Sequence, residues 1–226
     1  MILSVHQPNF APWLGYFHKM KQSDVFVFMD TVQFVKRHIC NRNKIKNSQG
    51  EAQWLTVPVR SDQGREVSFL ELGVNYEQKW QDKAVQTLRH AYGKAPYFQT
   101  YFPRIEELIR TEFPNLAELN IAWITFLARH LDVHPQLERM KDLPGNLGSK
   151  SEQIINICRH FGADVYLSGQ GARKYNDAEA FAQAGIALRY QEFKHPEYTQ
   201  LGPGFTSHLS ALDLLFNCGP ESPQYV

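Results

Sequence analysis

The amino-acid sequence predicts an α/β fold with a central, mostly parallel sheet and flanking helices. Near the start of the chain, an apolar run at 2–5, a helix from about Pro12 and a β-prone run at 25–29 follow one another. In the last third, candidate strands at 164–168 and 186–190 alternate with candidate helices. This alternation is typical of parallel sheets, in which helices cross over between neighbouring strands. We therefore expect a Rossmann-like architecture.

The first thirty residues carry clear signals. The run at 2–5 stops at a polar corner, 6–9, and a helix follows near Pro12 because proline is favoured in a first turn. The apolar residues of this helix have helical spacing: Trp13, Leu14, Phe17 and Met20. The run at 25–29 is continuously apolar, which suits a strand buried on both faces.

The middle of the chain changes character. A strand is expected at 54–59, where Pro58 argues for an edge or an end. Three helical patterns follow, separated by glycine and proline: 77–92, 98–112 and 115–131. The third is apolar nearly all round, so we expect it to be buried. We expect a single α/β domain over 1–226, with a helical subdomain or insertion at about 76–133.

The last third returns to alternation. A helix is expected at 149–160, where Ser149 and Glu152 have the spacing of a capping box. The elements that follow are, in order, a strand at 164–168, a turn with two glycines, a short helix capped by Asn176 or Asp177, a strand at 186–190 and a final helix at about 207–216.

The composition excludes several classes of protein. The 226 residues include 24 Lys and Arg against 23 Asp and Glu, a net charge of +1, which excludes a polyanion-coating protein and disfavours nucleic acid as a partner. The three cysteines, Cys40, Cys158 and Cys218, are widely spaced and odd in number, which indicates free thiols in a reducing compartment. Neither a signal peptide nor a membrane-spanning stretch is visible, so we expect a cytoplasmic protein that does not enter a membrane.

Polar residues follow the first two expected strands. In open α/β sheets, ligands bind beyond the carboxyl ends of strands, near helix N-termini. We therefore expect His6, Asn9 and Asp30 to take part in the chemistry, with Gln7 binding the ligand. The alternative is that His6 only caps the helix that follows.

The segment 31–50 contains five Lys and Arg and no acidic residue. Such an excess is unusual in a neutral protein, and these side chains bind phosphate and carboxylate groups. A solvated loop is the alternative, and Cys40 within it fits a buried inert thiol better than a catalytic one. The residues expected to form an anion clamp are Gln33, Lys36, Arg37, Asn41, Arg42 and Lys44.

The segment 168–174 lies between a strand and a helix. Its two glycines let the backbone approach a ligand, and its two basic residues can neutralise an anion. The third glycine of a dinucleotide-binding fingerprint is absent, and a tight turn with two surface bases is the alternative. The residues expected to bind the ligand are Ser168, Gly169, Gly171, Arg173 and Lys174.

The remaining histidines are more ambiguous. His195 lies in a turn beside Pro196, where it suits either a general acid or base or a structural role. His130 and His134 have a metal-like spacing, but Pro135 follows them directly and no further ligand motif accompanies them. We therefore expect no metal site.

Several motifs together resemble the WbqC-like protein family, and they cover nearly the whole chain. They are His6-Gln7-Pro8-Asn9-x-x-Pro12-Trp13-Leu14-Gly15-Tyr16-Phe17, Asp30-x-x-Gln33-Phe34-x-Lys36, Asn41-Arg42-x-Lys44-Ile45, Tyr166-Leu167-Ser168-Gly169, Phe193-x-His195-Pro196-x-Tyr198-x-Gln200 and Leu209-Ser210-x-Leu212-Asp213-Leu214-Leu215-Phe216-Asn217. Members of this family often lie in bacterial O-antigen and surface-polysaccharide gene clusters. The resemblance implies a transferase that attaches glycine or another acyl group to an amino sugar.

The opening of the chain is also similar to that of nucleotidyl-transfer enzymes with a HIGH motif, such as pantothenate synthetase. This similarity implies a nucleotidyl-transferase-like sheet and ATP or another nucleotide as a cosubstrate. The residues at 6–9 replace the HxGH pattern of those enzymes.

Two functions follow from these observations. The first is a transferase that passes an acyl or aminoacyl group, such as glycyl, to an amino sugar or nucleotide sugar in O-antigen biosynthesis. The second is a non-catalytic binding module for an anionic metabolite or nucleotide-sugar precursor. Both imply a small anionic ligand, and a tRNA-borne aminoacyl donor would require an additional contact with RNA.

Overall fold

The computed structural model describes residues 1–34, 39–60 and 67–226, and these residues form two compact units. The sheet unit comprises Met1–Gln7, His18–Met29 and His134–Lys194. The helical unit comprises Pro8–Phe17, Asp30–Val133 and His195–Val226. The expectation of a single domain with a helical insertion stays a prediction.

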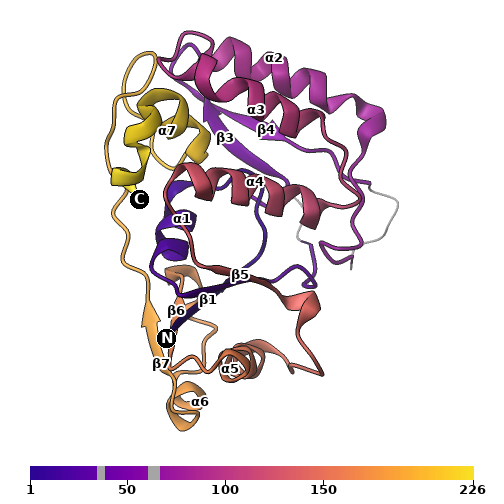
Figure 1. The fold of residues 1–226 in the computed structure, drawn as a ribbon, viewed down its shortest axis with the longest axis vertical. Helices are drawn as coiled ribbons and strands as arrows, with labels where there is room; N and C mark the ends of the chain where they lie inside the picture. The colour runs from indigo at the N-terminus through magenta and orange to yellow at the C-terminus, as the bar shows by residue number, and fades with distance from the viewer. Residues whose placement is uncertain (35–38, 61–66) are drawn as a thin grey trace. The chain divides into compact units, whose positions relative to one another are not determined.

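The sheet unit is built on five parallel strands (Figure 1). In chain order they are β1 (Ile2–His6), β2 (Val25–Phe28), β5 (Gln136–Arg139), β6 (Val165–Ser168) and β7 (Ala187–Tyr190). Their order across the sheet is β5-β2-β1-β6-β7, and every neighbouring pair is parallel. Numbered along the chain, the order is 3-2-1-4-5, the order of a Rossmann-like sheet. The predicted α/β fold with a mostly parallel central sheet is therefore confirmed.

The direction of the strand order reverses between β1 and β6. From β1 the chain adds β2 and then β5 on one side, and afterwards β6 and β7 on the other. A reversal of this kind leaves a crevice at the carboxyl ends of the two central strands, because the connections leave those ends in opposite directions. We call this place the switch point.

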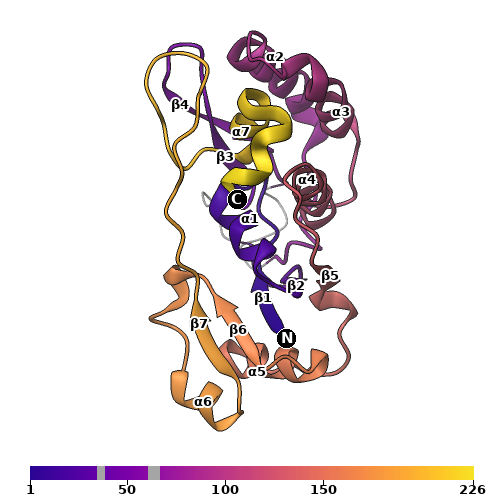
Figure 2. The ribbon, with the colours of Figure 1, turned by 60° about the vertical axis from the view of Figure 1, so that its left-hand side comes forward.

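Helices cover both faces of the sheet. Leu3, Val5, Val25 and Val27 point to one face, where they pack against apolar residues of α5 (Lys150–Phe161) and α6 (Ala178–Gln183). The alternate residue Ser4 points to the other face and accepts a hydrogen bond from Ser23, just beyond α1 (Leu14–Lys21). Figure 2 shows α5 and α6 beside this sheet.

The helical unit contains an antiparallel hairpin, β3 (Arg42–Lys46) with β4 (Ala52–Thr56), and four longer helices. These are α2 (Trp80–Tyr92), α3 (Phe98–Arg110), α4 (Leu116–His130) and α7 (Ala211–Cys218). Short 3₁₀ turns connect several elements: Tyr76–Gln78 and Gly219–Tyr225 here, and Met140–Asp142 and Gln170–Ala172 in the sheet unit. As expected, α4 is largely buried, with Trp123, Ile124 and Leu127 inaccessible to solvent.

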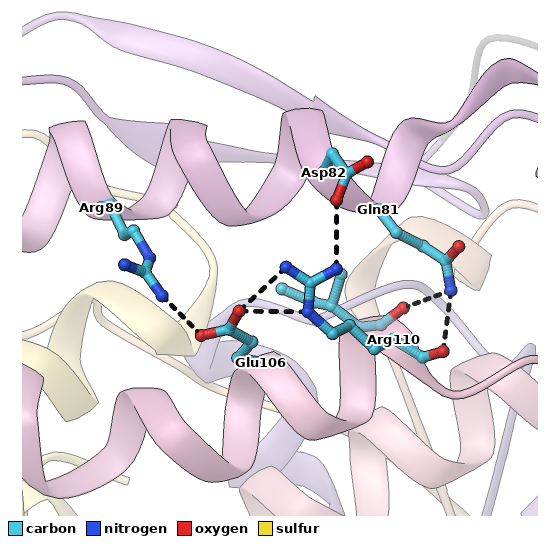
Figure 3. Close-up of polar contacts among 6 residues, drawn as sticks. Gln81, Asp82, Arg89, Glu106 and Arg110 are labelled. Carbon is cyan, nitrogen blue, oxygen red and sulfur yellow. Dashed lines mark hydrogen bonds and ion pairs between the residues drawn. The ribbon is translucent and has the colours of Figure 1, made fainter.

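Charged side chains tie α2 to α3 (Figure 3). Glu106 of α3 accepts hydrogen bonds from Arg89 of α2, at 2.8 Å, and from Arg110 of its own helix. Arg110 also donates to Asp82 of α2 at 3.1 Å. The hydrogen bond from Arg89 and the neighbouring arginine charges lower the pKa of Glu106, against a smaller opposing effect of burial. These groups are partly or fully exposed, so they define the alignment of the two helices more than their stability.

A buried carboxylate organises the other side of the helical unit. Asp213 of α7 accepts hydrogen bonds from Tyr92, at 2.9 Å, Tyr198, at 2.9 Å, and Gln200, at 2.8 Å. Burial raises the pKa of Asp213, and the hydrogen bonds from the two tyrosines oppose that shift. Asp213 thus joins α2, α7 and the segment around 198–200 through one side chain.

Three local features differ from what the sequence indicated. The strand expected at 54–59 is β4, displaced by about two residues and paired in the hairpin, and the basic segment before it contains β3. The short polar strand β5 had no signal, because its Gln-Leu-Glu-Arg sequence lacks both alternation and β-branched residues. Ser149 occupies the N-cap position of α5, but its side chain makes no capping hydrogen bond.

No helix in the described ranges is long and apolar enough to cross a membrane.

Candidate functional site

A cavity of about 780 Å³ opens at the switch point, within the sheet unit. It lies at the carboxyl ends of β1 and β6 and reaches the first turn of α5. We call it the switch-point cavity. Its lining residues are Val5, His6, Gln7, Lys19, Met29, Lys150, Ser151, Ile154, Tyr166, Ser168, Gly169, Gly171, Ala172, Lys174, Tyr175 and Asn176.

The cavity exists because the two central strands separate. β1 and β6 pair only at Ile2↔Val165 and Leu3↔Tyr166, whereas β6 and β7 stay paired as far as Ser168. Beyond these pairs the Ser4 hydroxyl donates to the carbonyl of Leu167 at 2.9 Å, so a side chain replaces the strand ladder. The two strands therefore part at the mouth of the crevice, where side chains take the place of the strand ladder.

His6 and Gln7 occupy the end of β1, as expected. The half-buried His6 ring has its Nδ1 atom 3.0 Å from the carbonyl oxygen of Gln7. In the tautomer that carries the proton on Nδ1, this contact is a hydrogen bond, and Nε2 is then an acceptor. The backbone carbonyl of His6 accepts a hydrogen bond from Met29, which fixes the corner to β2.

The loop after β6 forms the opposite wall. Ser168 is fully buried, and its hydroxyl accepts a hydrogen bond from Asn176 at 3.0 Å. Gly169 and Gly171 line the cavity, and an added Cβ at either would meet no atom within 4 Å. The open space beside their backbone fits the close approach of a ligand that the sequence suggested. The exposed Lys174 lies at the end of this loop.

The first turn of α5 closes a third side. Lys150 has a positive φ of +52°, a conformation that costs energy for any residue with a Cβ. Ser151 accepts a hydrogen bond from the backbone of Asp177 at 2.9 Å, which connects α5 to the start of α6. A backbone conformation of this kind beside a cavity is a common feature of binding sites.

A further residue of the cavity, Lys19, is not among those expected from the sequence. It belongs to α1, is only 3% exposed, and lines the cavity. Its Nζ atom donates to the carbonyl of Val5 at 3.0 Å and lies 5.9 Å from the centre of the Phe26 ring. Burial lowers the pKa of Lys19 to about 7. A signal was available, because this lysine stands between Phe17 and Met20 in a helix that is otherwise apolar on that side.

The electrostatics of the cavity favour an anion. Three lysines and one histidine line it, and no described carboxylate does. The apolar side chains of Val5, Met29 and Ile154 form part of the wall and lower the local dielectric. A phosphate or carboxylate bound here would meet positive charge from three different elements, α1, α5 and the loop after β6.

Six of the residues expected from the sequence therefore lie together: His6, Gln7, Ser168, Gly169, Gly171 and Lys174. Arg173 does not line the cavity; its guanidinium stacks 4.4 Å above the ring of Tyr190. Lys36 and Arg37 lie outside the described residues.

The other expected residues belong to the helical unit. Asn9 and Asp30 are buried, with 2% and 0% exposure, and Asn41 donates to the carbonyl of Val57 at 2.8 Å. Gln33 forms an isolated bridge with Ser68. Their expected parts in the chemistry and in anion binding stay predictions.

The hairpin places part of the expected anion clamp on one surface. Arg42 and Lys44 lie two residues apart on β3, so their side chains point to the same face of the hairpin. The Arg42 Cζ atom lies 4.2 Å from the centre of the exposed Trp54 ring on β4, and the Lys44 Nζ atom lies 5.4 Å from it. Trp54 pairs directly with Lys44 in the strand register and is 45% exposed. The basic residues of this segment are thus arranged around an aromatic ring, which the sequence alone did not indicate.

His195 lies in a cluster of rings within the helical unit. Its Nδ1 atom is 2.8 Å from the carbonyl of Pro196, and its ring is 5.0 Å from that of His208 and 6.4 Å from that of Trp13. Burial lowers the pKa of His195, the contact with Pro196 opposes the shift, and the neighbouring His208 adds to it. The neutral imidazole is therefore the favoured form near neutral pH.

The cysteines are all buried, including Cys40 and Cys158 at 0% exposure, and burial was expected for Cys40. In residues 1–34, 39–60 and 67–226, no group of three or more His, Cys, Asp or Glu side chains is placed to hold a metal ion.

The fold and the cavity define an α/β protein with a Rossmann-like sheet and an anion-favouring crevice at the switch point. The chain belongs to the WbqC-like protein family, whose sequence model matches residues 7–225. It is also 32% identical over 226 residues to the uncharacterized protein Rv1507c of Mycobacterium tuberculosis, and the match covers 99% of this chain and 96% of that protein. No solved structure matches the chain.

Proposed function

We propose that the protein is a cytoplasmic transferase that passes an acyl or aminoacyl group to an amino sugar or nucleotide sugar in surface-polysaccharide biosynthesis. The observation that supports this proposal is the switch-point cavity, which three lysines line without a described carboxylate. Nucleotides and activated acyl donors carry phosphates, and a crevice of this type is where parallel α/β sheets bind them.

The cavity residues suit distinct tasks in such a transfer. Lys150 and Lys174 hold the phosphate of the donor or of a nucleotide sugar, and the backbone of Gly169 and Gly171 lies against it. Gln7 orients the reacting group. The acceptor nitrogen attacks the acyl carbon, the bond from that carbon to the donor oxygen breaks, and the donor leaves with the electron pair. His6 accepts the proton that the acceptor nitrogen loses.

A ligand screen tests the proposal. Nucleotides, nucleotide sugars and amino acids are added singly, and the melting temperature is followed, because a ligand that binds the native state raises it. The Lys174→Ala variant should bind the best anionic ligand about tenfold more weakly, as expected when a charged hydrogen-bond partner is lost. Lys194→Ala, which changes an exposed lysine of the same unit outside the cavity, serves as the matched control.

Two results would contradict the proposal. One is a screen in which no anionic compound stabilises the protein. The other is equal weakening in Lys174→Ala and Lys194→Ala, which would indicate diffuse attraction to surface charge instead of a site.

A binding module is the second candidate, and the His6 contact favours it. The Nδ1 atom of His6 lies against the carbonyl of its own neighbour, Gln7, an arrangement that also serves simply to fix the corner of the chain. In this case the cavity holds a nucleotide-sugar precursor or another anionic metabolite without transforming it. The residue that separates the two candidates is His6 itself.

A further inference from the structure

Lys19 occupies the gap between the central strands. The carbonyl of His6 points to β2, where it accepts a hydrogen bond from Met29. Carbonyls alternate along a strand, so the carbonyl of Val5 points the other way, to the side of β6. The register pairs of β1 with β6 end before this point, and the Lys19 ammonium donates to the Val5 carbonyl instead. Lys19 thus stands where the ladder opens into the cavity.

An ammonium group has more hydrogen-bonding capacity than this contact uses. Nζ carries three N–H donors when it is charged, and the Val5 carbonyl takes one of them. Its neighbour on β2 is the face of Phe26, at 5.9 Å, which attracts a cation but accepts no conventional hydrogen bond. Donors therefore remain for a group that enters the cavity.

The ionisable groups around Lys19 are basic or neutral. His6 of β1, Tyr166 of β6, Lys150 of α5 and Lys174 of the following loop line the cavity with it. On its own helix, His18 and Lys21 are the nearest in sequence, and burial, assisted by the Lys21 charge, lowers the pKa of His18. Burial also raises the pKa of Tyr166, so that phenol stays neutral. No described carboxylate of the cavity compensates the Lys19 charge.

We propose that Lys19, the most buried of the three lysines that line the switch-point cavity, binds an anionic ligand there and takes up a proton when that ligand binds. This inference rests on the proposed function, because it concerns the same cavity and the same class of ligand. It adds a role for a residue of α1 and a dependence of affinity on pH.

The physical basis is the balance between desolvation and charge pairing. Burial destabilises the ammonium form of Lys19 in the empty cavity, which holds its pKa at about 7. An anion at hydrogen-bond distance restores the ammonium and raises the pKa again. Between these two pKa values, binding requires a proton from solution. The affinity for an anion therefore falls as the pH rises above 7, by up to about tenfold per pH unit for one coupled proton.

The test uses inorganic sulfate, whose charge stays constant across this range, at fixed ionic strength between pH 6.5 and 9. Dissociation constants come from the sulfate dependence of the melting temperature. Wild type should lose affinity above pH 7. Lys19→Arg should keep the affinity and lose this pH dependence, because a guanidinium stays charged. Lys19→Met should bind sulfate weakly at every pH, because it has no charge at this position. It is the second test variant, used if the larger arginine side chain disturbs the cavity.

Lys21→Arg is the matched control, since Lys21 lies two residues further along the same helix and is exposed. It should behave as wild type. His6→Gln should leave the slope above pH 7 in place.

Each other outcome has a distinct meaning. Sulfate binding with the same pH slope in wild type and Lys19→Arg would overturn the role of Lys19 while leaving the anion-binding cavity intact. Equal affinity in Lys19→Met and wild type would do the same. Absence of sulfate binding in wild type would overturn both this inference and the anion-binding cavity beneath it.

Discussion

His6 is the residue at which catalysis and binding can be distinguished. If it accepts the proton of the acceptor nitrogen, His6→Gln should keep ligand affinity roughly intact and slow turnover by about 10²–10⁴-fold. Glutamine retains a hydrogen-bonding side chain but does not titrate. The measurement is a comparison of kcat and ligand affinity with the compound that the screen identifies.

The alternatives at His6 are equally concrete. A protein that only binds would change in affinity alone, and a melted variant would show that His6 is a structural cap. A fully active His6→Gln enzyme would remove His6 from the chemistry and transfer the proton-accepting role to His195.

The raised pKa of the buried Asp213 predicts how the free energy of unfolding depends on pH. Its folded pKa is raised above its ordinary value of 3.8, so the folded state holds this proton more tightly than the unfolded state. The associated stabilisation is complete below pH 3.8 and is lost as the pH rises through the raised pKa. A tenfold difference in proton affinity between the folded and unfolded states corresponds to about 1.4 kcal/mol. As the pH rises above 3.8, the free energy of unfolding of wild type should therefore fall relative to that of Asp213→Asn.

Urea denaturation followed by tryptophan fluorescence measures this difference. Glu77→Gln, at an exposed position, is the control and should run parallel to wild type. Parallel curves for wild type and Asp213→Asn would show that the carboxyl group has no raised pKa in the folded protein.

The thiols should be structural. Cys40 is inaccessible to solvent, and its backbone carbonyl accepts hydrogen bonds from Phe10 and Asn120. These contacts depend on the main chain, so Cys40→Ser should keep its activity. Loss of turnover in a folded Cys40→Ser variant would instead indicate a covalent thiol mechanism, because a thiolate is the stronger nucleophile.

At the scale of elements, we predict that the β3–β4 hairpin binds an anion. Arg42 and Lys44 present two positive charges beside Trp54, without an acidic residue in the strand between them. Arg42→Ala should weaken the binding of inorganic pyrophosphate to this surface by about 1.5–3 kcal/mol. Quenching of Trp54 fluorescence reports binding, and Trp54→Phe identifies its share of the signal.

Arg104→Ala on α3 is the comparison for this experiment, since Arg104 is an exposed arginine that pairs with Glu107. It should leave the pyrophosphate affinity unchanged. Unchanged affinity in both Arg42→Ala and Lys44→Ala would return the segment to a solvated strand with ordinary surface charge.

The elements that the sequence predicted well are those with strong local signals. β2 is continuously apolar and α4 is rich in apolar residues, and Asp177, one of the two expected caps, accepts a hydrogen bond from the backbone N–H of Ala180 in α6. β5 and β3 could not be found in this way. Their residues are polar, and they form strands because a neighbour supplies hydrogen bonds, β2 in one case and β4 in the other.

In the candidate site, too, some residues could be placed from local sequence signals, whereas others depend on tertiary structure. Residues that directly follow a strand, such as His6 and Ser168, could be placed because sheet topology dictates where strand ends meet. For Lys19 the sequence offers only a lysine within an otherwise apolar helix, and its place at the cavity depends on the early end of pairing between β1 and β6, which is a feature of tertiary structure. Arg173 illustrates the reverse error: its neighbour Lys174 lines the cavity, while its own side chain stacks on Tyr190.

At the scale of the whole molecule, the two units allow a ligand to be localised by hydrogen exchange. A nucleotide sugar that fills the switch-point cavity should slow amide exchange in β1, β6 and the first turn of α5, because binding stabilises the elements around it. The amides of α2 and α3 provide an internal reference that should not change. Protection confined to α2 and α3, or to the groove of about 640 Å³ lined by Arg104, Phe126, Arg129 and His130, would place the ligand elsewhere.

The order in which the strands of the sheet are joined has a consequence for biosynthesis. The chain passes between the sheet unit and the helical unit five times, at residues 7–8, 17–18, 29–30, 133–134 and 194–195. Strands that are neighbours in the sheet are therefore separated in the sequence by segments of the helical unit. β1 is synthesised shortly before its neighbour β2, but its other neighbour, β6, begins only at Val165. Until β6 has been synthesised, β1 therefore carries an open edge of the kind that pairs readily with foreign strands. Nascent chains stalled before Val165 should consequently need a chaperone to stay unaggregated, whereas chains released after β7 should not.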